Sequence, residues 1–276
     1  MKIINCGGQL LDLTRPKVMG ILNVTPDSFF DGGQFRNEKS VLIQTEKMLS
    51  EGAAIIDIGG MSSRPNAEII SEKEELNRVL PAIRAVLREF PKAIVSIDTF
   101  RANVARASVA AGATMVNDIS AGELDPDMFK TMADLQMPYV MMHMRGTPKV
   151  MQNNPTYDQI QLEILDFFIK KLAILGGYGL KDIIADVGFG FGKTLEHNYI
   201  LLKKMTAFQI LDLPLLAGVS RKSMIYKLLD VSPNDALNGT TAAHMLALQN
   251  GANLLRVHDV KPAIETIKIY EYYSIC

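Results

Sequence analysis

The sequence predicts an α/β fold, namely a single (β/α)8 TIM barrel with a short N-terminal β cover. Eight short runs rich in Val, Ile and Leu occur along the chain, as expected for parallel strands that are buried on both faces. Segments with helical spacing separate the runs, and the length of 276 residues fits one barrel. We therefore expect one domain that spans residues 1–276.

Polar side chains recur at the ends of these runs. In chain order the runs and their polar residues are VMGILN with Asn23, AIIDIGG with Asp57, AIVSID with Asp98, TMVND with Asn117 and Asp118, YVMMH with His143, IIADVG with Asp186, LLAGVS before Arg221 and Lys222, and NLLRVHD with Arg256, His258 and Asp259. The carboxyl ends of all strands meet at one rim of such a barrel, and active sites are built there. The pattern therefore predicts an enzyme with a polar cup.

The remaining elements follow from local patterns. Residues 1–15 are expected to form a short antiparallel β cover at the bottom of the barrel. Helical stripes are found at 41–49 and 71–90, and Ser71 and Glu74 make a capping-box pattern at the start of the second. A third stripe consists of Leu162, Leu165, Phe168, Ile169 and Leu172.

Composition excludes several classes of protein. With a net charge of −1 the protein has no general positive electrostatic field that would attract a polyanion, which argues against nucleic-acid binding. The two cysteines, Cys6 and Cys276, show no metal-binding spacing. The first residues lack the apolar core of a signal peptide, and no run approaches the ~20 apolar residues of a membrane helix. We expect a cytoplasmic protein without a membrane partner.

The loops after the first two strands are long and rich in Gly, Pro and Asp. Such segments are turns, and they are also common as binding loops. Asn23 stands at the end of a buried strand, where its amide oxygen can bind a hard cation such as Mg2+. Ser63 and Arg64 suit a planar anion, because a guanidinium matches phosphate or carboxylate geometry.

Three acceptor side chains, Asp98, Asn117 and Asp186, end the third, fourth and sixth strands. A single Asp there is often a helix cap, but three in one cup suit a heterocycle with an amino-amide edge, such as a pterin or guanine. Met142 can pack on the face of such a ring or belong to the core. Phe191, in the stretch GFGFGK, can flank the ligand.

The last two strands end in basic residues. Ser220, Arg221, Lys222 and Ser223 open a helix, where two exposed bases would oppose the helix dipole. That cost favours an anionic ligand held by Ser223 and the nearby N–H groups. Arg256 and His258 alternate on one strand, so that both can point into the cup.

Eight motifs in this order resemble the bacterial dihydropteroate synthases from about residue 17 to residue 260. They are ILNVTPDSFFDGG, DIGG-x-SSRP, SIDT, VNDIS, MHM, D-x-GFGFGK-x-x-x-HN, GVSRKS and RVHDV. The resemblance implies a folate-pathway transferase that condenses 6-hydroxymethyl-7,8-dihydropterin pyrophosphate with p-aminobenzoate and releases pyrophosphate. That family is the sulfonamide target and is commonly dimeric, so a homodimer is expected.

The resemblance also implies a role for each site residue. The residues implied for the pterin are Asp98, Asn117, Met142, Asp186 and Lys222; for the pyrophosphate, Asn23, Ser63, Arg64, Arg256 and His258; for p-aminobenzoate, Phe29, Arg64, Pro65, Phe191, Lys222 and Ser223. Mg2+ is the implied cofactor, with Asn23 as its ligand and Asp31 joining when the loop closes.

The chain departs from the family pattern at two places. Met61-Ser62-Ser63 stands where the family usually has Glu-Ser-Thr, and Val187 stands where it usually has Pro. Neither change removes a charged site residue. Three alternatives stay open: the pterin-binding domain of a corrinoid methyltransferase, a lyase with Lys222 as Schiff-base nucleophile, and a barrel that sequesters a pterin without turnover.

Overall fold

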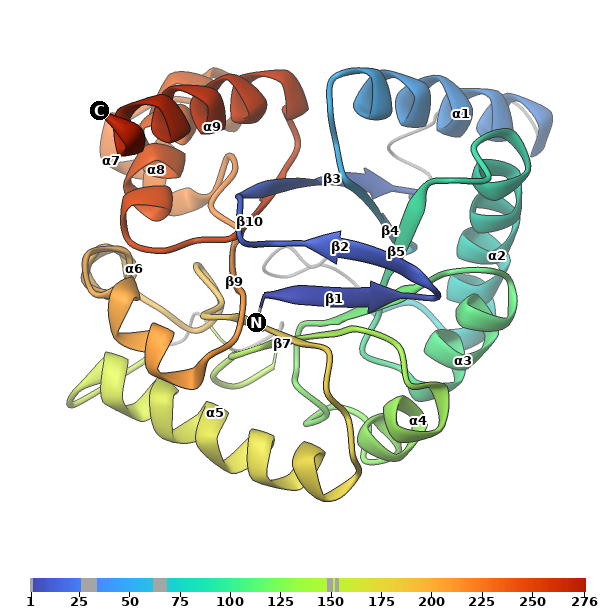
Figure 1. The fold of residues 1–276 in the computed structure, drawn as a ribbon, viewed down its shortest axis with the longest axis horizontal. Coiled ribbons are helices and arrows are strands. Elements are labelled where there is room, and N and C mark those ends of the chain that lie inside the picture. Colours follow the sequence, from blue (N-terminus) through green and yellow to red (C-terminus); the bar gives the residue numbers. More distant parts are fainter. Residues whose placement is uncertain (1, 26–33, 62–68, 148–150, 152–153) are drawn as a thin grey trace.

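Eight parallel strands close into a barrel in the computed structural model, which describes residues 2–25, 34–61, 69–147, 151 and 154–276 (Figure 1). The strands are β3 (Lys17–Asn23), β4 (Ile55–Gly59), β5 (Ile94–Asp98), β6 (Met115–Asp118), β7 (Tyr139–Met142), β8 (Ile183–Asp186), β9 (Leu215–Ala217) and β10 (Leu254–Val257). Each strand pairs with the next, and β10 returns to β3. The predicted (β/α)8 fold is confirmed.

A ring of helices surrounds the barrel (Figure 1). The α-helices are α1 (Gln34–Ser50), α2 (Glu72–Glu89), α3 (Ala102–Ala110), α4 (Met128–Leu135), α5 (Ile160–Gly177), α6 (Leu195–Lys203), α7 (Ser223–Leu229), α8 (Leu237–Gln249) and α9 (Val260–Ile275), and two 3-10 helices, η2 (Met205–Leu211) and η3 (Pro233–Asp235), lie between them. The predicted start of α2 is confirmed, because Ser71 Oγ accepts a hydrogen bond from the Glu74 N–H at 3.2 Å.

The stripe expected on α5 is partly wrong. Its buried side chains are Ile160, Ile164, Phe168 and Leu175, whereas Leu162 and Ile169 are exposed. Apolar residues are found on all sides of this helix, and so the sequence offers two overlapping stripes with the same spacing. Packing against the barrel selects between them.

An antiparallel hairpin covers one end of the barrel. It consists of β1 (Ile3–Cys6) and β2 (Gln9–Asp12) and crosses the barrel opening in Figure 1. Apolar side chains of the hairpin and of the residue after it pack against one inward-facing residue from each barrel strand: Ile4, Cys6, Leu11 and Leu13 contact a layer of Met19, Ile55, Ile94, Met115, Val140, Ile184, Leu216 and Leu254. The predicted β cover is therefore confirmed, and it closes the amino-terminal end.

The two-residue period of a strand determines what lies above this apolar layer. Residues two positions further along face the same way; they include Asp57, Asn117, Asp186 and Arg256. The alternate residues, such as Val116 and Val257, point outward and pack beneath the helices in the main core. The inside of the barrel thus has an apolar layer, here called the apolar floor, at its amino-terminal end and a polar layer directly above it.

One side chain ties the barrel seam to the amino-terminal cover. Asn253, just before β10, accepts hydrogen bonds from Lys2 Nζ and from the Leu215 N–H, both at 3.1 Å. Its amide nitrogen donates to the Leu13 carbonyl oxygen at 3.0 Å. Asn253 therefore joins β9, β10 and the end of the hairpin at one buried point.

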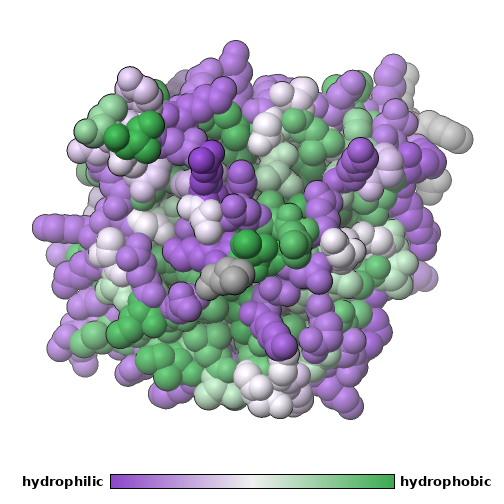
Figure 2. Space-filling model, viewed as in Figure 1, coloured by the Kyte–Doolittle hydropathy of each residue, from purple (hydrophilic) through white to green (hydrophobic). Residues whose placement is uncertain are grey.

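The outer surface is mixed in polarity. Figure 2 shows hydrophilic side chains over much of the hairpin face, with hydrophobic groups between them, one of which lies at the carboxyl end of α9. Tyr272, Tyr273 and Ile275 are exposed in that helix. None of the helices in the described part of the chain is long and apolar enough to cross a membrane.

Leu13→Ala is expected to destabilise the protein by about 2–5 kcal/mol, because it removes a fully buried side chain from the packed end of the barrel. Leu10→Ala is the matched control: Leu10 is 71% exposed, and its loss should change stability by less than about 0.5 kcal/mol. Urea unfolding followed by circular dichroism measures both. Equal effects of the two changes would show that the hairpin is not part of the core.

Candidate active site

A buried carboxylate, Asp57 on β4, lies at the centre of the polar layer. Its Oδ2 accepts a hydrogen bond from Arg256 Nε at 2.7 Å and another from the Asn117 amide nitrogen at 3.0 Å. Its Oδ1 is buried and has no hydrogen-bond partner in the described part of the chain. Asp57 therefore fixes the side chains of two other strands and still presents one acceptor.

Arg256 joins two carboxylates across the barrel. Besides its bond to Asp57, its terminal nitrogen lies 2.6 Å from Asp98 Oδ2. Burial opposes the charge on this guanidinium, yet the two carboxylates outweigh burial and raise the pKa of Arg256. Burial raises the pKa of Asp98 to about 7, although the charge of Arg256 pulls it down. The side chains of β4, β5, β6 and β10 thus form one network of charge-assisted bonds.

Asp186 and Lys222 form the opposite wall of the cup. Asp186 Oδ1 accepts a hydrogen bond from the Gly188 N–H at 2.8 Å, and burial raises its pKa. Lys222 Nζ donates to the Phe189 carbonyl oxygen and lies 4.6 Å from the centre of the Phe191 ring. Burial lowers the pKa of Lys222 to about 8, with the charge of Asp186 opposing that shift.

Glycine leaves space between these polar groups. A methyl group built on Gly218 would lie 3.8 Å from Lys222 Nζ and 3.9 Å from Asp186 Oδ2. A methyl group on Gly59 would lie 3.5 Å from Asn23 Oδ1 and 3.6 Å from Asp98 Oδ2. Asn23 and Asp98 therefore border one side of the cup, and Asp186 and Lys222 border the other.

An apolar cluster flanks the polar cup at the rim. It consists of Phe100, Ile119, Met142, Met144, Met151 and Phe191, with Met61 and Leu124 packed against it. Met142 is a core residue here and also ends β7 beside Asp186, with which it is in register. Both interpretations of Met142 are therefore compatible with its position.

The loop after β8 lies tightly against the end of β7. A Cβ on Gly188 would collide with the His143 carbonyl oxygen, and one on Gly192 would collide with that of Arg145, which explains the alternating glycines. Buried Lys193 Nζ lies 3.0 Å from His143 Nδ1 and donates to the Phe191 carbonyl oxygen at 3.0 Å. These contacts hold the loop whose Phe189 carbonyl oxygen and Phe191 ring lie beside Lys222.

The residues after β9 and β10 are also in contact. Ser220 Oγ lies 3.1 Å from His258 Nδ1. Arg221, which the sequence suggested as an exposed base, is instead 22% exposed and pairs with Asp259 at 2.7 Å. That interpretation was wrong because the partner carboxylate lies 38 residues further along the chain. Ser223 is the first residue of α7, directly after Lys222.

The structure brings together many of the predicted site residues. Those on described parts of the rim are Asn23, Asp98, Asn117, Met142, Asp186, Phe191, Lys222, Ser223, Arg256 and His258. Phe29, Asp31, Ser63, Arg64 and Pro65 lie outside the described residues. The carboxyl ends of the strands therefore form one polar cup, as predicted.

Two features of the cup were not predicted. Asp57 received no role, although its place two residues before the end of β4 was a usable signal. The contact between Lys193 and His143 had no signal in the sequence, because it depends on how two loops pack. The departure at Val187 places a fully buried side chain in the main core rather than in the cup.

Asp57→Asn is expected to destabilise the protein by about 1.5–3 kcal/mol, because it removes the charge of one of the two carboxylates that pair with the partly buried Arg256, while Asp98 remains. The control is Asp134→Asn, which breaks the exposed pair with Arg106 and should cost no more than about 1 kcal/mol. Chemical unfolding at pH 7 gives both values. Similar small losses would mean that the Asp57 network does not stabilise the barrel.

Comparisons with known proteins identify the family of the chain. Residues 19–258 match the family described as pterin binding enzyme. A dihydropteroate synthase from Haemophilus influenzae is 44% identical over 263 residues, which cover 95% of both chains.

Solved structures extend the likeness. A Yersinia pestis dihydropteroate synthase in complex with a sulfonamide drug superposes with a TM-score of 0.93 at 43% identity, over 99% of this chain and 100% of that one. A dihydropteroate synthase from Xanthomonas albilineans in complex with 7,8-dihydropteroate gives a TM-score of 0.89 at 37% identity, over 99% of each chain. With a family match over most of its length and relatives at this level of identity, the chain belongs to the dihydropteroate synthases of the pterin binding enzyme family.

Proposed function

We propose that this protein condenses 6-hydroxymethyl-7,8-dihydropterin pyrophosphate with p-aminobenzoate and releases pyrophosphate. The observation that carries the proposal is the set of acceptors formed by buried Asn117, buried Asp186 and partly buried Asp98 beside a basic Lys222, in a chain of this family. The complex of the Xanthomonas relative with 7,8-dihydropteroate supports the same product.

The pterin is proposed to lie between the two walls of the cup. The amide nitrogen of Asn117 is engaged by Asp57, so its oxygen is left to accept a hydrogen bond from the ligand. Asp98 and Asp186 can accept N–H groups of the amino-amide edge, and Lys222 can donate to a ring acceptor. Met142 offers an apolar surface to the ring from the rim cluster.

The pyrophosphate is proposed to bind near Asn23, Arg256 and His258, together with Ser63 and Arg64 as the resemblance implies. Mg2+ fits this arrangement as a substrate-assisted cofactor. Among the described residues no cluster of three or more His, Cys, Asp or Glu could hold a metal by itself, and the Asn23 amide oxygen faces the cup. Mg2+ commonly combines few protein oxygens with water and phosphate. When bound, it would neutralise charge on the leaving pyrophosphate.

The p-aminobenzoate is proposed to lie further out, over the loop between β9 and α7. Ser223 and Lys222 would receive its carboxylate, and the Phe191 ring would contact its ring. Phe29, Arg64 and Pro65 complete this subsite in the interpretation from sequence. The contact of Lys222 with both Phe189 and Phe191 supports its position between the two substrates.

The reaction breaks the bond from the pterin methylene carbon to oxygen and forms a carbon–nitrogen bond. Pyrophosphate leaves with the bonding electrons, the aniline lone pair attacks the carbon, and the nitrogen then loses a proton. Burial lowers the pKa of His143 to about 2 and that of His244 to about 4, which makes both weak bases. An arylamine requires no strong base, and so positioning and charge stabilisation supply the catalysis.

A homodimer and a cytoplasmic location remain predictions. Support for a dimer comes from apolar side chains exposed on neighbouring helices: Leu228 and Leu229 on α7, Leu246 on α8, and Ile269 and Tyr272 on α9.

A pyrophosphate-release assay tests the function directly. Release is expected only when the pterin pyrophosphate, p-aminobenzoate and Mg2+ are all present, and Asn23→Ala should raise the Mg2+ concentration that is required. Binding of the pterin without release would support the sequestering barrel. Borohydride trapping of a carbonyl substrate on Lys222 would support the lyase. Release that does not depend on p-aminobenzoate would contradict the proposed condensation.

Lys222→Met is expected to abolish pterin binding while raising the melting temperature of the protein without ligands. The folded pKa of about 8 lies below the ordinary value of 10.5, so folding carries the cost of a buried cation below pH 8, at most roughly 3 kcal/mol. That cost falls as the pH rises from 8 to 10.5, because the folded protein releases its proton first. The stabilisation by Met should therefore be largest at pH 7 and fade toward pH 10. Calorimetric melting across this range measures it, and destabilisation at every pH would contradict the assignment.

A further inference from the structure

The barrel has little backbone pairing where its two basic loops begin. β9 and β10 are in register at only two positions, Leu216 with Leu254 and Ala217 with Leu255, whereas β3 and β4 are in register at five. Beyond these pairs the two segments that follow β9 and β10 continue as separate loops. The loop after β9 carries Lys222 and Ser223, and the loop after β10 begins at His258. The relative position of these site residues therefore depends on side-chain contacts.

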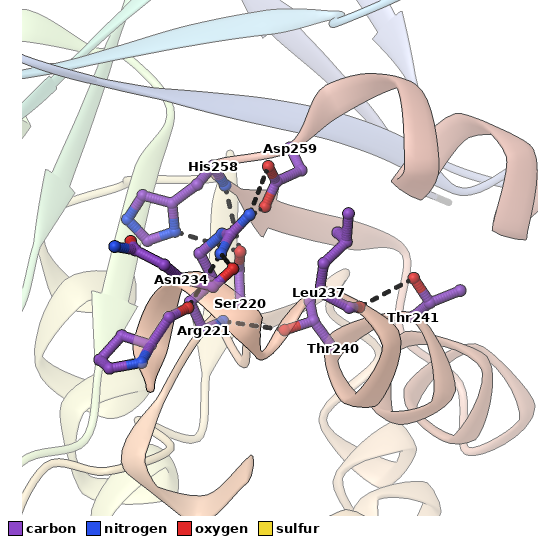
Figure 3. Close-up of polar contacts among 9 residues, drawn as sticks. Ser220, Arg221, Asn234, Leu237, Thr240, Thr241, His258 and Asp259 are labelled. Carbon is purple, nitrogen blue, oxygen red and sulfur yellow. Dashed lines mark hydrogen bonds and ion pairs between the residues drawn. The ribbon is translucent and has the colours of Figure 1, made fainter. Parts of the chain in front are cut away.

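Two consecutive residues after β9 contact two consecutive residues after β10 (Figure 3). Ser220 Oγ lies 3.1 Å from His258 Nδ1 and accepts the His258 backbone N–H at 3.2 Å. Arg221 donates from Nε and from a terminal nitrogen to the Asp259 carboxylate, at 2.7 and 3.0 Å. The four residues thus continue the pairing of β9 with β10 past the end of the ladder.

Arg221 is held on its other sides as well. Its second terminal nitrogen donates to the carbonyl oxygens of Pro233 and Asn234, at 2.9 and 2.6 Å. Its backbone N–H donates to Thr240 Oγ1 at 3.0 Å, with φ at +52° in the left-handed region. A side chain other than glycine stays there only where its surroundings hold it. The chain reverses at Arg221, directly between Ser220 and Lys222.

We propose that Ser220 and Arg221 are positioning residues for the reaction. By contacting His258 and Asp259, they hold Lys222, which follows them in the chain, in a fixed position relative to His258. This inference rests on the proposed function, since it concerns the same two substrates. Arg221 acts through Asp259 and the backbone, and it does not itself contact the ligands. The planar fork of arginine is required, because one lysine amine cannot reproduce four directed bonds to a carboxylate and two carbonyl groups.

In the proposed arrangement Ser220 also selects the tautomer of His258, by donating its hydroxyl proton to Nδ1 across the 3.1 Å contact. Ser220 Oγ accepts the backbone N–H of His258 and has one hydroxyl proton of its own to donate, which the ring nitrogen can accept. Donation from Ser220 to His258 Nδ1 makes that nitrogen the acceptor, and the neutral ring then carries its proton on Nε2. An Nε2–H group is a donor suited to an anionic phosphate.

Arg221→Lys and Asp259→Asn test the positioning role, and Arg106→Lys, which alters the exposed pair with Asp134, is the matched control. Calorimetry with Mg2+-pyrophosphate alone and steady-state kinetics with both substrates are measured beside the melting temperature. We expect pyrophosphate affinity and kcat to fall by about 10- to 100-fold in both variants, as displacement of site groups does. The double variant should be no worse than Arg221→Lys alone, because the contact that Asp259→Asn breaks is already lost in that variant. The control should match the wild type.

Wild-type affinity and kcat in Arg221→Lys would overturn the proposal, as would a wild-type protein that does not bind pyrophosphate. Losses that multiply in the double variant would also overturn it, since they would show independent roles. Wild-type protein that binds pyrophosphate but turns over neither substrate would refute the proposed function alone. The binding comparison would then still decide the positioning role.

Nitrogen NMR of Ser220→Ala tests the tautomer separately, and with four histidines in the chain the His258 signals can be assigned by substitution. The wild type is expected to show an unprotonated Nδ1 and a protonated Nε2. Ser220→Ala should lose this preference and bind Mg2+-pyrophosphate more weakly. The same tautomer in both proteins would remove Ser220 from the proposal.

Discussion

The buried contact between Arg256 and the carboxylates Asp57 and Asp98 is the interaction on which the site depends. It joins β10 to β4 and β5 across the inside of the barrel, immediately above the apolar floor. Charges at this depth are tolerated only when they are paired and hydrogen-bonded. Because Asp57 also holds the Asn117 amide, one contact fixes the orientation of acceptors that come from separate strands.

The cup balances opposite charges without cancelling all of them. Burial raises the pKa of Asp98 and Asp186 and lowers that of Lys222, so each of these groups lies closer to neutrality than it would in water. A ligand that brings donors to the carboxyl groups and an anion to the lysine relieves this penalty on both sides. Desolvation raises the free energy of these charged groups in the empty site. The same desolvation strengthens the hydrogen bonds and ion pairs that a ligand forms with them.

Much of the fold followed from the two-residue period of the strands and from the polar residue at each strand end. Asp98, Asn117 and Asp186 could be placed at one rim because parallel strands share a direction, without knowledge of any contact. The environment of Arg221 could not be predicted, since Asp259 becomes its neighbour only when β9 and β10 lie side by side. The buried face of α5 was ambiguous because its apolar residues surround the helix. Shared periodicity is thus visible in a sequence, whereas the choice between equivalent packings is made in three dimensions.

The position of Asn253 has a consequence for how the protein is made. This residue binds Lys2 and Leu13 at the start of the chain, and it lies just before the strand that closes the barrel against β3. During synthesis the first strands and the hairpin leave the ribosome long before their final neighbour exists. The apolar floor therefore stays incomplete until β10 has emerged. Loops this long close slowly, and so the nascent barrel passes through a stage in which its interior is open to aggregation and to chaperones.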